Sequence, residues 1–246
     1  MAMPAKKLQR LDNKVYEMGL LQHLTELRAR LIWIILSFAV CAVASFPLSG
    51  TVIDHITRSA GQLVVIHPSE AFFAHLQVSL VMGVVAVSPI LLYHLIAFLA
   101  PALTRGERRG LYLFLPFGLL LFAGGCIFAF FVVVPFVYRF FLSFTTGSLE
   151  PFISLSSYIG FVTSMVMPFG VIFELPLAIV CLTQIGIITP DFLVKNRKYC
   201  VFAIFIFAAV LTPPDIISQA SMALPLLGLF ELSIVLSRMV HRAKKS

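Results

Sequence analysis

The amino-acid sequence predicts an all-α polytopic membrane protein with six transmembrane helices, and three observations support this class. Apolar residues make up 60% and charged residues 12% of the 246 residues, about half the charged share of a soluble domain. The mean hydropathy is +1.01. Sixteen of the 18 lysines and arginines lie in four clusters at alternate ends of the apolar runs, which is the charge bias of cytoplasmic loops. Six spans with this bias place both termini in the cytoplasm.

The same composition excludes several classes of function. The net charge of +7 is a signal of membrane topology and not of a nucleic-acid site, because the basic residues follow the spans. The four cysteines have no paired spacing, so neither a disulfide framework nor a metal site is expected. No HExxH, GxSxG or Walker A sequence occurs, so we expect no enzyme activity and no cofactor.

The chain is predicted to form a single transmembrane domain over residues 1–246, with a disordered cytoplasmic tail at 1–16. An amphipathic stretch that begins at Leu20 leads into the first span. The predicted spans cover residues 31–46, 71–100, 111–137, 158–188, 199–211 and 216–237. The fifth and sixth are short. Kinks are expected at the prolines inside spans, which are Pro89, Pro168, Pro176 and Pro225.

Glu174 is the polar residue that most needs an explanation, because it lies midway along the predicted fourth span. A charged side chain at that depth costs about 3 kcal/mol. One interpretation is a protonated carboxyl that donates a hydrogen bond to a neighbouring helix. The favoured one is a water-lined or partner-facing site, because ionisable residues inside membranes usually serve a function.

Two further glutamates have ordinary structural interpretations. Glu107 fits a capping box with Thr104 at the start of the third span, where the helix dipole also favours an anion. Glu26 precedes Arg30 by one helical turn, so the two can form an ion pair. Taken alone, each glutamate is explained by local structure.

The third and sixth spans carry residues that suit helix packing. The third contains Gly118, Gly124 and Gly125, which would permit close helix approach. In the sixth, Gln219 suits an interhelical hydrogen bond. Glu231 approaches Arg238, which predicts a solvated ion pair.

Several separated motifs lie in order along nearly the whole chain, from about residue 20 to 240. They are HLTELRAR at 23–30, FLAPAL at 98–103 with ERR at 107–109, FG at 169–170 with FELP at 173–176, and LTPPD at 211–215 with SQ at 218–219. With these motifs on six spans, the chain resembles TatC, the multispanning core component of the twin-arginine protein translocase. One departure is visible, because many relatives have a proline in the first outside loop roughly where Gly61 stands.

The resemblance implies a receptor in the bacterial cytoplasmic membrane that binds the Arg-Arg signal peptides of folded proteins at its cytoplasmic face. It also implies self-association, assembly with the single-span proteins TatA and TatB, and export driven by the proton-motive force. Kinked spans are expected to form a concave face. The implied site residues are Glu26, Phe98 and Glu107 for the signal peptide, Glu174 within the membrane, and Thr212 and Gln219 for the partners.

The chemistry of the glutamates agrees with this assignment. Two adjacent guanidiniums need carboxylates that accept paired N–H bonds, and lysine fits such a site less well. Two rival classes stay open at this point. A secondary solute transporter also suits six spans, a mid-membrane acid and broken helices, and uptake of labelled solute into vesicles would favour it. A structural scaffold would have no affinity for an Arg-Arg peptide.

Overall fold

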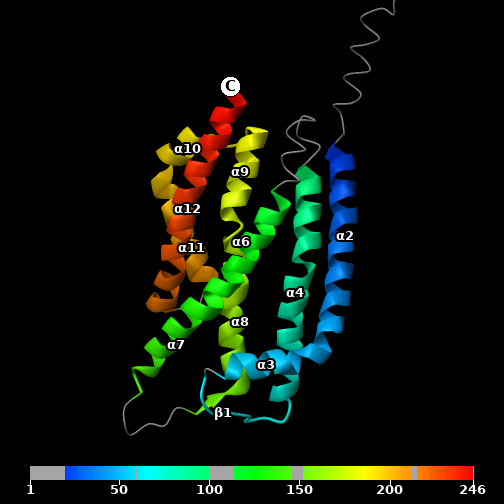
Figure 1. Cartoon of the computed structure of the whole chain (residues 1–246), viewed down its shortest axis with the longest axis vertical. Coiled ribbons are helices and arrows are strands. Elements are labelled where there is room, and N and C mark those ends of the chain that lie inside the picture. Colours follow the sequence, from blue (N-terminus) through cyan, green and yellow to red (C-terminus); the bar gives the residue numbers. More distant parts are fainter. Residues whose placement is uncertain (1–19, 59, 100–113, 146–151, 212–214, 246) are drawn as a thin grey trace, which may run out of the picture.

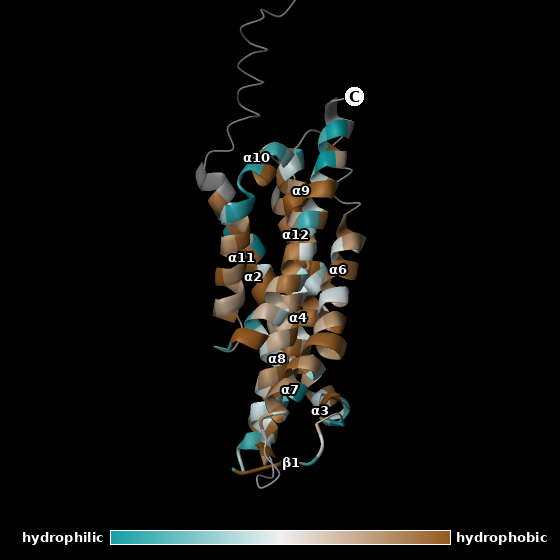
Figure 2. Ribbon diagram, turned by 90° about the vertical axis from the view of Figure 1, so that its left-hand side faces the viewer, coloured by the Kyte–Doolittle hydropathy of each residue, from teal (hydrophilic) through white to brown (hydrophobic). Residues whose placement is uncertain are grey.

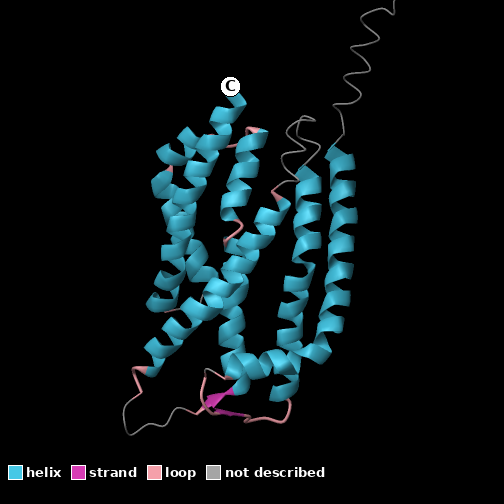
Figure 3. Cartoon of the chain, viewed as in Figure 1, coloured by secondary structure: helices cyan, strands magenta, loops and turns pink. Residues whose placement is uncertain are grey.

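The computed structural model describes residues 20–58, 60–99, 114–145, 152–211 and 215–245, and within these ranges the protein is almost entirely helical (Figure 3). The predicted disordered tail at 1–16 lies outside the described residues. The elements before residue 114 are α2 (Leu20–Ser45), η1 (Phe46–Leu48), α3 (Ser49–Thr57), β1 (Leu63–Val64) and α4 (Glu70–Leu99). Those of residues 115–185 are α6 (Leu115–Phe128), the π-helical segment η3 (Ala129–Val133), α7 (Val134–Leu142), β2 (Ile153–Ser154), α8 (Leu155–Ile172) and α9 (Leu175–Ile185). The last three are α10 (Pro190–Lys195), α11 (Arg197–Leu211) and α12 (Ile216–Lys245).

Apolar residues cover the middle of the molecule and polar residues gather at its two ends (Figure 2). Among the described residues, five helical stretches are long and apolar enough to cross a membrane: Leu24–Thr57, Glu70–Phe98, Leu115–Leu142, Leu155–Ile185 and Ile216–Arg242. Helix α11, which contains the predicted short fifth span, has only 15 residues. The described helices therefore support a polytopic membrane protein, and its sixth crossing stays a prediction.

Helix α12 is longer than the short sixth span that the sequence predicts at 216–237. It has 30 residues and continues to Lys245. The extension carries Arg238, His241 and Arg242, and positive charge is favourable near the C-terminus of a helix. The helix therefore persists beyond its apolar part.

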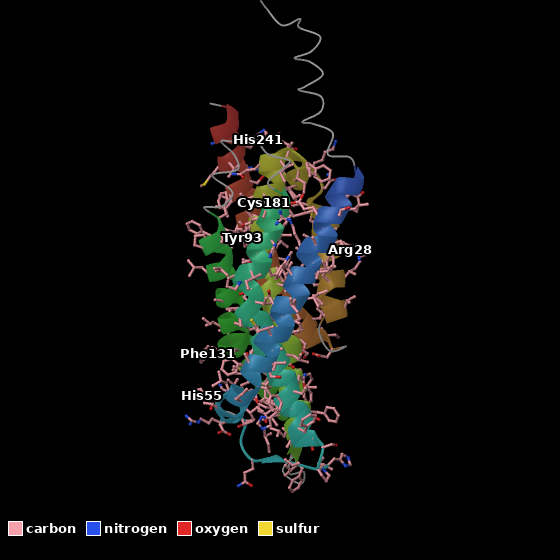
Figure 4. The ribbon with its side chains drawn as sticks, turned by 90° about the vertical axis from the view of Figure 1, so that its right-hand side faces the viewer. Arg28, His55, Tyr93, Phe131, Cys181 and His241 are labelled. Carbon is pink, nitrogen blue, oxygen red and sulfur yellow. The ribbon has the colours of Figure 1, made fainter. Side chains whose placement is uncertain are left out.

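The helices run along the long axis of the molecule, and its two ends differ (Figure 1). The start of α2 and the end of α12 both lie at the upper end, which we call the terminal end. Helix α3 and the two strands lie at the opposite end, the strand end. Arg28 and His241 accordingly lie in the upper half of Figure 4 and His55 in the lower. Helix α2 packs along α4, and α4 in turn packs against the central helices α6 and α8.

Two of the three glycines of the predicted third span lie in tight helix contacts. A Cβ atom at Gly118 would lie 2.8 Å from Leu177 Cδ2 and 3.2 Å from Glu174 Oε2. A Cβ atom at Gly125 would lie 2.5 Å from the carbonyl oxygen of Phe169. The prediction for Gly124 was wrong, since nothing lies within 4 Å of a Cβ atom there. Gly118 and Gly125 therefore lie on the face of α6 that packs against α8 and α9, and Gly124 lies outside that face.

The predicted fourth span is interrupted halfway along its length. Helix α8 ends at Ile172 and α9 begins at Leu175. Pro176 lies in the first turn of α9, where a proline is tolerated because the N–H it lacks would have no partner within the helix. Phe173 and Glu174 form the break between the two helices. Pro89, Pro168 and Pro225, by contrast, lie inside continuous helices.

Glu70, the first residue of α4, ties the strand end together. Its carboxylate accepts hydrogen bonds from the backbone N–H of Ile66 at 2.7 Å and of Ser156 at 3.0 Å. The residue is only 8% exposed. Beside it, β1 pairs with β2 in parallel, with Leu63 opposite Ile153. One buried carboxylate thus joins segments that are 86 residues apart.

Replacing Glu70 with alanine is expected to destabilise the strand end by about 1–3 kcal/mol, because buried N–H groups then lose their acceptor. Hydrogen exchange at the amides of Ile66 and Ser156 measures the effect. Asp54→Ala is the matched control, because Asp54 is an exposed carboxylate of the adjacent α3. Equal exchange rates in the two variants would contradict this role for Glu70.

The loop before β1 turns at Gly61, whose φ is +79°. Proline could not take this conformation, because its ring holds φ near −65°. The path of this loop therefore depends on a residue other than proline at this position.

Candidate functional site

Arg30 joins helices α2 and α4 near the terminal end. Its Nε donates to Oε1 of Glu26 at 3.0 Å, and its Nη2 donates to the same oxygen. The Nη2 atom also donates to the carbonyl oxygen of Ala97 on α4 at 3.3 Å. The ion pair that the spacing of Glu26 and Arg30 predicts is therefore confirmed, and it has a third member that the spacing does not indicate.

This contact brings two of the three predicted signal-peptide residues to the same place. Phe98 follows Ala97 directly on α4 and is half-buried, so Arg30 bridges the helix of Glu26 and the turn that carries Phe98. The third residue, Glu107, lies outside the described residues. The structure therefore places the carboxylate and the arginine of α2 next to the end of α4 that carries Phe98.

Glu174 lies in the break between α8 and α9, with its side chain turned inward. Both carboxyl oxygens are buried, and neither has a hydrogen-bond partner among the described residues. Oε2 lies against Gly118 of α6, where the absence of a side chain leaves room for it. The interpretation of Glu174 as a donor to a neighbouring helix finds no acceptor within the described ranges.

An apolar groove has residues of the first turn of α9, just after the Glu174 break, in its lining. Its volume is about 430 Å³, and side chains of α6, α9 and α12 line it. Pro176 and Leu177 form its wall closest in sequence to Glu174, and Met239 and Val240 belong to its far end. The break that carries the buried carboxyl is therefore followed directly in sequence by residues that line an apolar groove.

Gln219, one of the two predicted partner-contact residues, lies where α11 meets α12. Gln219 Nε2 donates to the carbonyl oxygen of Phe205 on α11 at 3.2 Å, so its interpretation as an interhelical donor is confirmed. Thr212 lies outside the described residues. Asp215 Oδ1 accepts from the backbone N–H of Ser218 at 2.7 Å and so caps α12.

Glu231 has a different partner from the one that the sequence predicts. It pairs with Arg197, at the start of α11, and not with Arg238. Arg238 is seven residues further along the same helix, and the packing of α11 against α12 brings Arg197 closer. The pair is exposed on both sides, so it contributes little to stability.

Sequence reasoning missed two contacts of the site and its surroundings. The bond from Arg30 to Ala97 joins residues 67 positions apart, and the bond from Ser156 to Glu70 joins residues 86 apart. Only the four-residue spacing of Glu26 and Arg30 was a usable signal, because local periodicity reports neighbours on one helix.

The fold and these sites define a polytopic helical membrane protein, with a carboxylate at one end and a buried carboxyl in a broken membrane helix. The profile of the family described as Sec-independent protein translocase protein (TatC) matches residues 22–225. The chain belongs to the TatC family, whose members are translocase components and not enzymes.

Individual relatives agree with the family profile. The chain is 36% identical to the Sec-independent protein translocase protein TatCy of Bacillus subtilis (strain 168), over 95% of this chain and 94% of that one. It is also 36% identical to TatC of Aquifex aeolicus (strain VF5), over 93% and 98%. A crystal structure of the twin arginine translocase receptor TatC superposes with a TM-score of 0.79, at 35% identity, over 89% of this chain and 99% of that one. The family predicted from the motifs is thereby confirmed.

Proposed function

We propose that this protein is the signal-peptide receptor and core component of a twin-arginine translocase. It binds the Arg-Arg signal peptides of folded proteins at its cytoplasmic face and assembles with further copies of itself, TatA and TatB. Export is driven by the proton-motive force across the bacterial cytoplasmic membrane, with six spans and both termini in the cytoplasm. Membership of the TatC family supports this function over a solute transporter.

The observation that carries the proposal is the hydrogen bonding of Arg30, which links Glu26 on α2 to the end of α4 that carries Phe98. A partly exposed carboxylate near a helix end that carries a half-buried aromatic residue suits a peptide in which an apolar residue follows a pair of arginines. Carboxylates accept the paired N–H bonds of a guanidinium in a fixed geometry, which an ammonium cannot offer. Glu107 is proposed as the second carboxylate.

Two other regions are proposed to act after the signal peptide has bound. Glu174 lies beside an apolar groove, and we assign it to a concave intramembrane face that meets a peptide hairpin or a polar group of a partner. Thr212 and Gln219 are assigned to contacts with TatA and TatB. Support for the second assignment comes from Gln219, whose position at the seam of α11 and α12 is half-buried.

Charge-neutral replacement of either receptor carboxylate is expected to weaken binding of an Arg-Arg peptide about tenfold or more, since a charge-assisted pair is lost. The variants are Glu26→Gln and Glu107→Gln, each in the purified full chain in nanodiscs. Binding is measured by fluorescence anisotropy of a labelled peptide, and the melting temperature of the Glu107→Gln variant is expected to stay nearly unchanged.

The Lys-Lys version of the same peptide is the ligand control, and it should bind weakly to every form of the protein. If the Arg-Arg peptide bound the wild type and both variants equally, or bound no better than the Lys-Lys peptide, the receptor function would be wrong.

A further inference from the structure

Arg30 pairs with Glu26, the carboxylate that is proposed to bind an arginine of the signal peptide. Two of its nitrogens, Nε and Nη2, donate to Oε1 of Glu26, and Nη2 reaches the carbonyl of Ala97 as well. The side chains of Arg30 and Glu26 are only 21% and 26% exposed. A guanidinium of the chain itself therefore holds the place that an incoming guanidinium would take.

We propose that Arg30 is an internal competitor, which pairs with Glu26 while the receptor is empty and is displaced when a signal-peptide arginine binds. The inference rests on the proposed function, because it needs Glu26 to be part of the peptide site. The exchange replaces one guanidinium by another, so Glu26 keeps the same kind of charge-assisted bonds throughout. Without Arg30 the empty receptor would hold a mostly buried carboxylate with no cation, which is unfavourable.

The geometry also gives the incoming arginine a first contact. Both bonds from Arg30 go to Oε1, and Oε2 accepts no hydrogen bond from the part of the chain that the structure describes. A peptide guanidinium can bind Oε2 before Arg30 leaves Oε1. The carboxylate is then never bare during the exchange.

Departure of Arg30 changes α4 as well as α2. The carbonyl of Ala97 loses its donor, and this carbonyl immediately precedes Phe98. A second donor of the peptide can take its place there, next to the aromatic ring. The exchange thus links the carboxylate on one helix to the apolar contact on the other.

An internal competitor lowers the apparent affinity for the peptide by the fraction of time for which Glu26 is free. Arg30→Gln is therefore expected to bind the Arg-Arg peptide more tightly than the wild type, by about tenfold if Glu26 is free about one-tenth of the time. In a Glu26→Gln background the same change is expected to have no effect on affinity, since the shared carboxylate is gone.

The matched control is Arg28→Gln, which removes the same charge from an exposed position of the same helix (Figure 4). It separates competition for Glu26 from a general gain in attraction for a cationic peptide. Anisotropy titrations of the full chain in nanodiscs compare the wild type, both single variants and the Glu26→Gln/Arg30→Gln double variant. Thermal melting of each confirms that it is folded, and Arg30→Lys replaces Arg30→Gln if the latter does not fold, with a smaller gain expected.

The outcomes separate this inference from the proposed function. Tighter binding by Arg30→Gln alone, lost in the double variant, supports the competitor. Weaker or unchanged binding by Arg30→Gln, or an equal gain from Arg28→Gln, would overturn the competitor while the receptor function stands. If Glu26→Gln itself binds like the wild type, the proposed site fails and the competitor with it.

Discussion

Alanine at Gly125 is expected to destabilise the protein by about 3 kcal/mol, whereas alanine at the neighbouring Gly124 is expected to leave it as stable or slightly more so. The added methyl group at Gly125 would lie 2.5 Å from the carbonyl oxygen of Phe169 and 2.8 Å from the Phe173 ring atom Cγ. Such overpacking costs about 1–3 kcal/mol when the neighbours cannot move. Gly124 has open space around it, and there alanine gains about 0.5–1 kcal/mol in helix propensity.

The clash at Gly125 cannot be relieved by a side-chain rotation, because its nearest neighbour is backbone. Phe169 is fully buried and its ring packs against Phe128 at 5.9 Å between centroids, so α8 cannot shift without opening this cluster. Thermal melting of the purified variants in one detergent measures the difference. Equal melting temperatures for the two alanine variants would show that the contact between α6 and α8 is looser than the structure has it.

The class of the fold could be predicted from the sequence because each helix that crosses a membrane must be a continuous apolar stretch of the chain. Long apolar runs and basic clusters depend on composition alone. Local stereochemistry was also readable, because Glu26 pairs with Arg30 across one turn as their spacing predicts. The break at Glu174 falls within the expected fourth span because Pro176 needs an N-terminal helix position.

What could not be predicted depends on which helix faces end up together. Glu231 finds Arg197 across a helix contact, and Arg30 finds the carbonyl of Ala97. The two-residue strands pair at the strand end over a separation of 90 positions, Leu63 with Ile153, and strands this short leave no alternation in the sequence. Each of these contacts joins residues that are far apart in sequence, so the periodicity of apolar residues along the chain could not predict it.

Glu174 is expected to be costly for stability and necessary for export. Its carboxyl oxygens are buried with no hydrogen-bond partner in the described part of the chain, and such a group costs about 1–3 kcal/mol. Glu174→Leu is therefore expected to raise the melting temperature of the purified protein. The same change is expected to reduce export of a folded reporter with an Arg-Arg signal at least tenfold, on the order of 1.4 kcal/mol, because the proposed intramembrane contact is lost.

The amide in Glu174→Gln separates hydrogen bonding from ionisation. An amide can still donate and accept hydrogen bonds but carries no charge. Partial export by Glu174→Gln would therefore show that Glu174 acts through hydrogen bonding. Loss of export in this variant would show that it acts through its carboxylate. Export is measured in cells that lack their own copy of the protein, at equal amounts of each variant in the membrane.

Phe173→Leu is the matched control, because it changes packing in the same break and leaves the carboxyl in place. Its ring lies 5.7 Å from Phe128 and 6.3 Å from Phe169 between centroids, so its loss should lower stability while export continues. Glu174→Leu then raises stability while export falls, and Phe173→Leu lowers stability while export continues, a pattern that no general folding defect produces. Wild-type export by Glu174→Leu would show that transport does not need this carboxyl, and a melting temperature below that of the wild type would show that the carboxyl stabilises the fold.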